Sequence, residues 1–118
     1  MIDIAEDVYK KAVTKIEHGE IFYNKMGDIA LKNADCDTAL ESYRKVVELN
    51  PLNRNAWAKL AAVLQKFYPD FKDETIDCYE KLLELDENKA PVYYELGHLY
   101  LSKDDKLNSV SAFKLALE

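Results

Sequence analysis

The chain has 118 residues, of which 48% are hydrophobic and 32% charged, and this is enough for one domain with a continuous core. Three glycines and three prolines leave few tight turns for a sheet protein, and no apolar run approaches the roughly 20 residues that cross a bilayer. Residues 1–6 are acidic and amphipathic, unlike a secretory signal. Cys36 and Cys78 lack metal-ligand spacing, so we expect reduced thiols. These features indicate an intracellular, cytoplasmic protein without a membrane anchor.

The net charge of −6 is concentrated in one stretch of the chain. Residues 70–95 hold nine acidic and three basic residues, whereas the rest of the chain is balanced. Part of this excess forms a stripe with helical spacing, made of Asp73, Asp77, Glu80, Glu84 and Glu87. The stripe is either a solvated outer face or a docking surface for a basic partner. In both cases it would repel phosphate backbones, so we expect no nucleic-acid binding.

Aromatic residues return at nearly fixed spacing along the chain. One series has separations of 34, 36 and 34 residues and consists of Tyr9, Tyr43, Tyr79 and Phe113. A second series keeps the same step and consists of Tyr23, Trp57 and Tyr93. Self-similarity at this period predicts a stack of helical hairpins, each burying its apolar face on the next.

Other positions repeat with the aromatic series. Small residues recur in two columns, which are Gly27, Ala61 and Gly97, and then Ala39, Thr75 and Ser109. A further column holds Ala30, Leu64 and Tyr100. Steps of three and four within each half predict helices, not strands. The small residues would let paired helices approach closely, while the aromatic side chains fill the space between hairpins.

The pattern predicts where helices begin and end. We expect helices near residues 20–32, 35–49, 54–67, 72–85, 90–102 and 105–117. Asp35 and Asp105 stand where an N-cap would open the second helix of a pair. Pro51 and Pro91 suit a helix entrance, where a missing N–H costs little.

Residues 1–18 add half a repeat. Ala5, Tyr9 and Ala12 stand 34 residues ahead of Ala39, Tyr43 and Val46, which predicts the second helix of a repeat whose first helix is absent. A polar capping helix is the alternative. The whole chain would then divide into 1–18 (half-repeat or cap), 20–53, 54–89 and 90–118.

These columns resemble the tetratricopeptide repeat, a helix–turn–helix unit of about 34 residues. Residues 57–61 and 93–100 carry the first half of its signature, and residues 39–46 with Pro51 carry the second half. Glu87 stands where the family has proline, and the middle repeat is two residues longer. The resemblance implies an all-α fold: a right-handed superhelical solenoid of antiparallel helix pairs, with about three and a half repeats and seven helices.

The resemblance also implies a binding surface. In this family the first helices of successive hairpins line a concave groove that receives a peptide or a helix of a partner protein. The residues that would line it here are Asn24, Lys25, Asp28, Lys59, Ala62, Lys66, Tyr94, Glu95 and His98. A carboxylate clamp of the kind found in chaperone adaptors is disfavoured, because Asp28 and Glu95 stand where donors are needed.

The two extra residues of the middle repeat fall in an aromatic turn that contains Phe67, Tyr68 and Phe71. These side chains either fold back over the hairpin end or form an exposed contact, because aromatic residues dominate binding hot spots.

We expect neither catalysis nor a cofactor or metal. His18 and His98 are the only histidines, and the chain has no phosphate-binding glycine loop and no zinc-binding helix motif. The predicted function is a protein–protein interaction scaffold. The alternative is a segment of a longer solenoid that acts through open ends, including homodimerisation, and through its acidic face.

Overall fold

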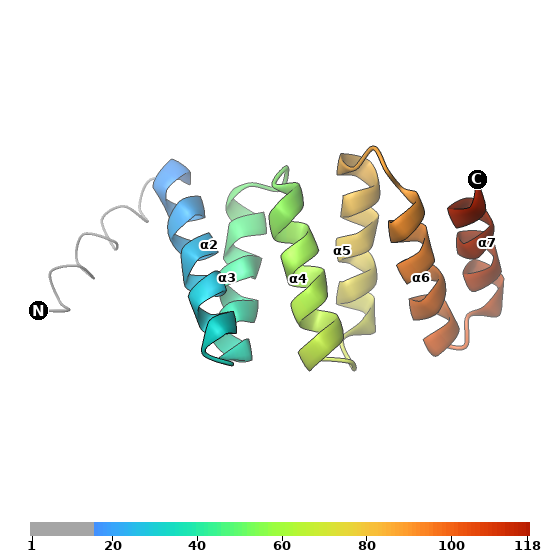
Figure 1. Cartoon of the computed structure of the whole chain (residues 1–118), viewed down its shortest axis with the longest axis horizontal. Coiled ribbons are helices and arrows are strands. Elements are labelled where there is room, and N and C mark those ends of the chain that lie inside the picture. The colour runs from blue at the N-terminus through green and yellow to red at the C-terminus, as the bar shows by residue number, and fades with distance from the viewer. Residues whose placement is uncertain (1–15) are drawn as a thin grey trace, which may run out of the picture. The chain divides into compact units, whose positions relative to one another are not determined.

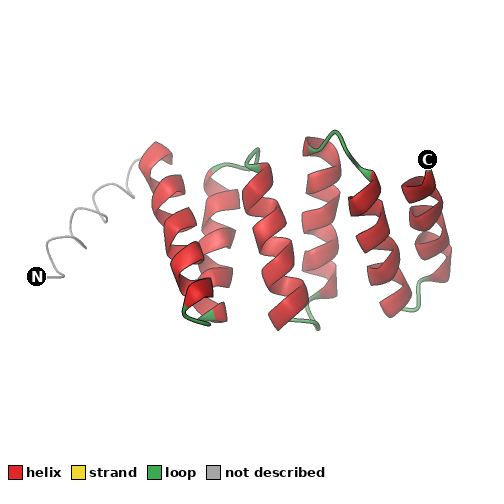
Figure 2. Cartoon of the chain, in the orientation of Figure 1, coloured by secondary structure: helices red, strands yellow, loops and turns green. Residues whose placement is uncertain are grey.

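The computed structural model describes residues 16–118, and this part of the chain contains only helices and connecting loops (Figure 2). In chain order (Figure 1) the helices are α2 Ile16–Lys32, α3 Cys36–Leu49, α4 Arg54–Phe67, α5 Lys72–Leu85, α6 Ala90–Ser102 and α7 Lys106–Leu117. All of them except α2 begin and end within one residue of the expected bounds. The prediction of an all-α fold made of helix pairs is therefore confirmed.

The prediction of a half-repeat or capping helix at residues 1–18 can be compared with the structure only in part. Residues 1–15 lie outside the described residues, and residues 16–18 belong to α2, which begins earlier than the expected position 20. The six helices of residues 16–118 leave the expected seventh helix in the undescribed part. The division into repeats stays a prediction. The chain forms two compact units, residues 1–56 and 57–118, and each is described by itself.

In the first unit, α2 and α3 run antiparallel side by side (Figure 1). Gly27 of α2 faces the ring of Tyr43 on α3, and a Cβ at Gly27 would lie 2.6 Å from Cε1 of that ring. Tyr43 is fully buried. Leu40 and Val46, three residues before and after it on α3, are also buried. The small residue thus lets the two helices approach closely, as the repeat pattern predicts. The pattern also places the aromatic ring between neighbouring hairpins, and this is wrong for Tyr43, whose ring packs inside its own helix pair.

The second unit repeats this packing in α6 and α7. A Cβ at Gly97 would lie 2.6 Å from Cε1 of Phe113. Ser109 belongs to the second column of small residues and lies in the first turn of α7. Its hydroxyl donates to the carbonyl of Gly97 at 2.9 Å. The same spacing of small and aromatic residues therefore produces the same helix-pair contact in both units.

The core of the second unit joins three helices. Its buried members, from α5, α6 and α7, are Ile76, Leu82, Val92, Leu96, Leu99 and Ala112. Trp57 and Ala58 of α4 pack against this cluster, together with Tyr79 and Tyr93. The apolar stripes of α5 and α6 are therefore buried between neighbouring helices, and burial of this kind stabilises a repeat protein.

The turns inside the two helix pairs are alike. Ala34 has φ of 59° and Asp104 has φ of 60°, so each turn passes through the left-handed region. The residue after each one is the N-cap of the next helix. Asp35 accepts from the backbone N–H of Thr38, and Asp105 accepts from that of Asn108, both at 3.2 Å. The predicted capping role of both aspartates is confirmed.

The two prolines behave differently. Pro91 lies in the first turn of α6, as expected. The expectation for Pro51 is wrong, because Pro51 lies in the turn before α4 and the helix begins at Arg54. Asn53 takes the capping role there, and its side chain accepts from the backbone N–H of Ala56 at 3.0 Å.

Candidate functional site

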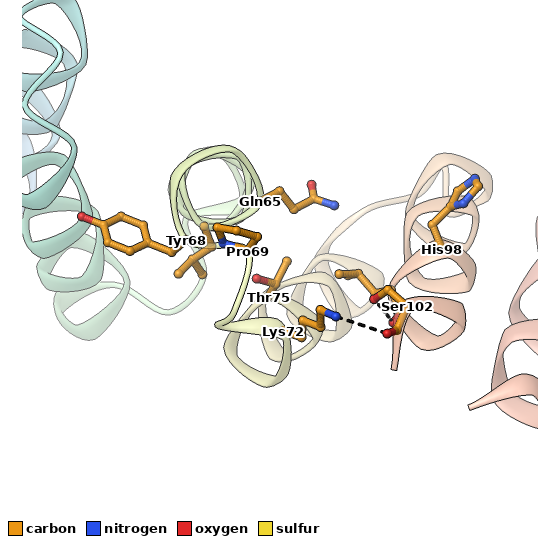
Figure 3. Close-up of a pocket in the computed structure, with 9 residues that line it drawn as sticks. Gln65, Tyr68, Pro69, Lys72, Thr75, His98 and Ser102 are labelled. Carbon is orange, nitrogen blue, oxygen red and sulfur yellow. Dashed lines mark hydrogen bonds between the residues drawn. The ribbon is translucent and has the colours of Figure 1, made fainter. Parts of the chain in front are cut away.

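The second unit contains a hollow between α4, α5 and α6, with a volume of about 250 Å³. The residues that line it are Leu64, Gln65, Tyr68, Pro69, Lys72, Thr75, His98, Leu99 and Ser102. Figure 3 shows Gln65 reaching from α4 and His98 standing on α6, with Lys72 and Ser102 at a shared edge. The hollow therefore offers apolar surface with several hydrogen-bonding groups along its wall.

Gln65 links the three helices around this hollow. The hydroxyl of Tyr79 on α5 donates to Oε1 of Gln65 at 2.5 Å, and Nε2 of Gln65 donates to Oε2 of Glu95 on α6 at 3.3 Å. Burial, and then the nearby carboxylate of Glu95, raises the pKa of Tyr79 to about 12. The phenol therefore stays protonated at neutral pH and keeps its role as a donor. This chain of bonds fixes the orientation of the Gln65 amide beside the hollow.

A second set of contacts joins the start of α5 to the end of α6. Nζ of Lys72 donates to the backbone carbonyl of Ser102 at 3.2 Å, as the dashed line in Figure 3 shows. The hydroxyl of Ser102 donates to the carbonyl of Leu99 at 2.7 Å. Lys103 forms an ion pair with Asp73 next to them. These contacts hold one edge of the hollow in place.

Three aromatic rings stand beside the hollow. Tyr94 and His98 on α6 have ring centroids 4.6 Å apart, and Phe113 of α7 lies 5.1 Å from His98 and 5.9 Å from Tyr94. All three contacts are edge-to-face. Tyr94 is 53% exposed and His98 is also exposed. His98 therefore belongs both to the wall of the hollow and to this aromatic cluster, which we call the Tyr94 cluster.

The predicted groove residues of the second unit are distributed unevenly. His98 lines the hollow, Glu95 bonds to one of its lining residues, and Tyr94 lies in the neighbouring aromatic cluster. On α4, Lys59 is half-buried, whereas Ala62 and Lys66 are exposed and outside the lining. The structure thus brings the α6 residues together and leaves those of α4 apart from the hollow.

In the first unit the predicted groove residues lie on α2. The carboxylate of Asp28 accepts from the hydroxyl of Tyr43 at 2.5 Å. Burial, with a smaller contribution from Asp28, raises the pKa of Tyr43 well above its ordinary value. Lys25 is exposed and Asn24 is half-buried. Asp28 is therefore already engaged in the contact between α2 and α3.

The first unit also has a hollow that the sequence did not indicate. It measures about 460 Å³ and is lined by Tyr23, Met26, Thr38, Glu41, Ser42, Arg44, Lys45 and Glu48. None of the predicted groove residues is among these. Met26 shares its repeat position with Leu60 and Leu96, which are buried, yet 38% of its surface is exposed.

The aromatic turn agrees with neither expectation in full. Phe67 is 39% exposed and Phe71 is 43% exposed, so they cover the hairpin end only in part. Tyr68 is half-buried, and its ring centroid lies 5.4 Å from that of Phe71. Nζ of Lys66 lies 5.4 Å from the centroid of the Phe67 ring. Tyr68 is also part of the wall of the hollow, which links the insertion to the candidate site.

Gln65, Lys72 and Ser102 were missed by sequence reasoning. Gln65 is a polar residue after two buried ones, Val63 and Leu64, which is the one signal the sequence contains. Lys72 and Ser102 are joined by a bond from the Lys72 side chain to the backbone carbonyl of Ser102, and residue type does not reveal this contact.

The acidic stripe of α5 is solvent-exposed at all its positions. Glu84 pairs with Lys81 at 3.7 Å, and Asp73 pairs with Lys103. Exposed pairs of this kind contribute little to stability. Cys36 is half-buried and Cys78 is buried, and no disulfide joins them.

Among residues 16–118, no group of histidine, cysteine, aspartate or glutamate side chains has an arrangement that would hold a metal ion. No helix in that range combines the length and apolar character needed to span a membrane.

Comparison with known proteins identifies the family. A family model for the tetratricopeptide repeat matches residues 22–51 and 90–118, together half of the chain. The general transcriptional corepressor ssn6 of Schizosaccharomyces pombe is 30% identical over 95 residues, which cover 79% of this chain and 8% of the corepressor. The chain spans less than a fifth of the length of the curated relatives it matches.

Solved structures agree with this. The crystal structure of MamA protein has a TM-score of 0.72 and 26% identity, covering 83% of this chain and 52% of that one. The crystal structure of YrrB, described as a TPR protein with an unusual peptide-binding site, has a TM-score of 0.69 at 20% identity. It covers 97% of this chain and 61% of YrrB, and at that identity the likeness shows the fold alone. The chain is therefore a member of the tetratricopeptide repeat family.

Proposed function

We propose that this chain is a protein-interaction module and that the hollow between α4, α5 and α6 holds a peptide segment of a partner protein. The observation that carries this proposal is the hollow itself, at about 250 Å³. Small-molecule sites measure about 300–1,000 Å³, so this volume suits one or two side chains of a longer ligand. The peptide-binding site described for YrrB, a protein of the same fold, supports this assignment.

The lining groups match the needs of a peptide. Leu64 and Leu99 give apolar surface for a side chain of the partner. Gln65 and His98 provide polar atoms that can bond to backbone amides and carbonyls of an extended segment. Because Gln65 is already held by Tyr79 and Glu95, little side-chain freedom is lost when a partner binds.

The Tyr94 cluster extends this surface. An exposed tyrosine ring offers a large, rigid contact area at low entropic cost, and aromatic residues of this kind dominate binding hot spots. Tyr94 is held by His98 and Phe113, so it is already oriented before a partner arrives. We expect a second apolar side chain of the peptide to pack here.

The remaining predicted groove residues stay proposals. Asn24, Lys25 and Asp28 belong to the first unit, and Lys59 lies on α4 outside the lining of the hollow. A longer partner segment would contact them only if it continued beyond the hollow.

A second candidate function is contact through the end helices, as in a segment of a longer solenoid or a homodimer. The observation that favours it is the exposure of apolar side chains on α7, with Leu107 80% and Leu117 88% exposed. A docking role for the acidic face of α5 rests on its exposure alone and is the weaker part of this candidate.

The first function is tested with peptides selected from a random library displayed on phage against the whole chain. Fluorescence anisotropy then gives the dissociation constant of each selected peptide for the parent chain and for Tyr94→Ala and His98→Ala. Loss of a hot-spot contact weakens binding by about tenfold or more. Glu80→Ala, a change on the exposed face of α5, is the matched control and leaves affinity unchanged. Peptides that bind Tyr94→Ala and His98→Ala as tightly as the parent would overturn the proposal.

A further inference from the structure

Helix α7 differs from α3 and α5, the second helices of the two earlier pairs, at one solvent-exposed repeat position. In α3 and α5 this position is a lysine that pairs with a glutamate three residues later: Lys45 with Glu48 at 3.6 Å, and Lys81 with Glu84 at 3.7 Å. In α7 the same repeat position is Leu115, which is 42% exposed. A charged, solvated position has thus become an apolar one in the last repeat.

Positions that are buried in the earlier second helices are bare on α7. Val110 is 51% exposed, whereas Leu40 and Ile76, its equivalents in α3 and α5, are 5% and 6% exposed. Leu117 is 88% exposed, whereas its equivalent in α3, Val47, is 8% exposed and its equivalent in α5, Leu83, is half-buried. The apolar face that covers a following first helix therefore exists on α7 but covers nothing within residues 16–118.

Helix α2 shows the complementary deficiency. Met26 and Ile29 are 38% and 58% exposed, whereas their equivalents on α6, Leu96 and Leu99, are 3% and 9% exposed. Met26 also lines the hollow of about 460 Å³ in the first unit, beside Tyr23. Among residues 16–118, nothing covers the face of α2 that corresponds to the covered face of α6, and a hollow lies beside Met26 on it.

The second unit contains the interface that these two faces would make. Ile76 and Leu82 of α5 share one buried cluster with Leu96 and Leu99 of α6 and with Ala112 of α7. Val110 stands at the repeat position of Ile76, and Met26 stands at that of Leu96. Both halves of an interface that is buried inside this chain are thus exposed elsewhere on it.

We propose that a second copy of this chain docks its α7 onto α2 of the first copy, in the packing that α5 makes on α6. This names the partner for the second candidate function above and rests on it. The charges agree: α7 with Glu118 contains two lysines and one acid, whereas α2 contains three acids and two lysines. Taken over the whole helices, the two net charges have opposite signs, which favours α7 on α2 over α7 on α7 or α2 on α2.

Such a contact joins two different surfaces, so each added copy leaves one of each face free. A contact of this kind extends into a chain of copies unless it closes into a ring, whereas a symmetric contact stops at a dimer. The stoichiometry of assembly therefore distinguishes the proposed contact from the symmetric alternatives.

The test is sedimentation equilibrium of the whole chain over a range of concentrations. Variant A carries Val110→Glu and Leu117→Glu, which block α7. Variant B carries Met26→Glu and Ile29→Glu, which block α2. The control is Leu52→Glu, which changes a leucine that is 76% exposed in the turn before α4 and on neither face. Circular dichroism checks that each variant is folded, because all five positions are exposed and the helices should be retained.

We expect the parent and the control to increase in mass with concentration beyond twice 13.6 kDa. Variant A alone and variant B alone should remain at the monomer mass. Their equimolar mixture should form a dimer and stop there, because each copy contributes its one intact face.

Two results would overturn the proposal. A parent that stays monomeric at every concentration would mean that no second copy binds. The second result is a parent that stops at a dimer while variant B also dimerises and the mixture of A and B is no larger than variant B alone. It would mean that α7 of one copy contacts α7 of the other. Neither result bears on the peptide site, since Tyr94 and His98 are intact in both variants.

Discussion

The ring of Tyr43 packs so closely on the backbone of Gly27 that a Cβ added there would lie 2.6 Å from Cε1. Because Tyr43 is fully buried, its ring has no open space into which to move. The glycine is thus required by a close helix approach and not by a turn. The same contact joins Gly97 and Phe113 in the second unit, where the aromatic residue is only half-buried.

Gly27→Ala should destabilise the chain, and Gly97→Ala should do so less. Overpacking a core costs about 1–3 kcal/mol, and the better helix propensity of alanine offsets up to about 1 kcal/mol of this. Phe113 can yield toward solvent, whereas Tyr43 cannot. Urea unfolding followed by circular dichroism measures both free energies of unfolding. Equal losses in the two variants would mean that burial of the facing ring is not what decides the cost.

The turn before α3 should tolerate glycine better than alanine. Ala34 has φ of 59°, and alanine in the left-handed region costs about 1 kcal/mol or more. Glycine removes this strain but adds freedom to the unfolded chain, so Ala34→Gly should be neutral to about 1 kcal/mol stabilising. The equivalent change Asp104→Gly should gain less, because aspartate adopts this region more readily. Urea unfolding of both variants measures the change in the free energy of unfolding. A larger increase for Asp104→Gly than for Ala34→Gly would contradict the prediction.

The N-cap of α7 should contribute measurably to the free energy of unfolding although it lies near the protein surface. Asp105 accepts from the backbone N–H of Asn108, and removing such a cap costs about 0.5–2 kcal/mol. Asp105→Ala should therefore lower the free energy of unfolding, while Asp105→Ser should recover most of it. Lys106→Ala, next in the chain, is the control. If the serine variant is as unstable as the alanine variant, the side chain does not act as a cap.

The cap of α3 predicts a response to acid. Hydrogen bonds from Thr38 hold the pKa of Asp35 below its usual value. Its contribution to stability is therefore present above the unfolded pKa and is lost as pH falls through the folded one. Comparing Asp35→Ala with the parent between neutral and acid pH should show the two unfolding curves converging at low pH. A difference that persists at low pH would contradict this origin.

Stability should also fall at alkaline pH. The pKa of Tyr79 is raised to about 12 and that of Tyr43 is raised further, while an unfolded tyrosine titrates near 10. Both phenols are protonated below this range, so their contribution is complete there. Above pH ~10 the unfolded chain loses these protons first, and stability falls by about 1.4 kcal/mol per pH unit for each tyrosine.

Variants separate the two tyrosines. Tyr43→Phe and Tyr79→Phe should each remove one share of the alkaline slope, measured by urea unfolding between pH 9 and 12. Tyr94→Phe, which changes an exposed ring, is the control and should leave the slope intact. An unchanged slope in both core variants would show that the buried phenols do not cause it.

The helices were predictable because their signals are local. Steps of three and four residues identify each stripe, and the aspartates at 35 and 105 act on backbone groups within the next turn. Pro51 was misplaced because proline suits both a helix entrance and a turn, and only the bond that the Ala56 N–H donates to the Asn53 side chain decides between them.

The site was less predictable because it depends on distances between helices. Gln65 matters through Tyr79 and Glu95, which are 14 and 30 residues away, and the two-residue insertion shifts the expected register between them. His98, which the family pattern assigns to the groove, lines the hollow, whereas Ala62 and Lys66 lie outside its lining. That any of the three contacts a partner stays a prediction. The exposure of Met26 was equally hidden, since spacing alone marks it as a core position.

The most direct test of the central claim is amide NMR of the whole chain titrated with a library-selected peptide. Binding in the proposed hollow should shift the amide signals of Gln65, His98 and Ser102, and those of the outer face of α5, such as Glu80 and Glu84, should stay in place. Shifts confined to α5, or to α2 and α3, with the hollow unchanged, would contradict the account.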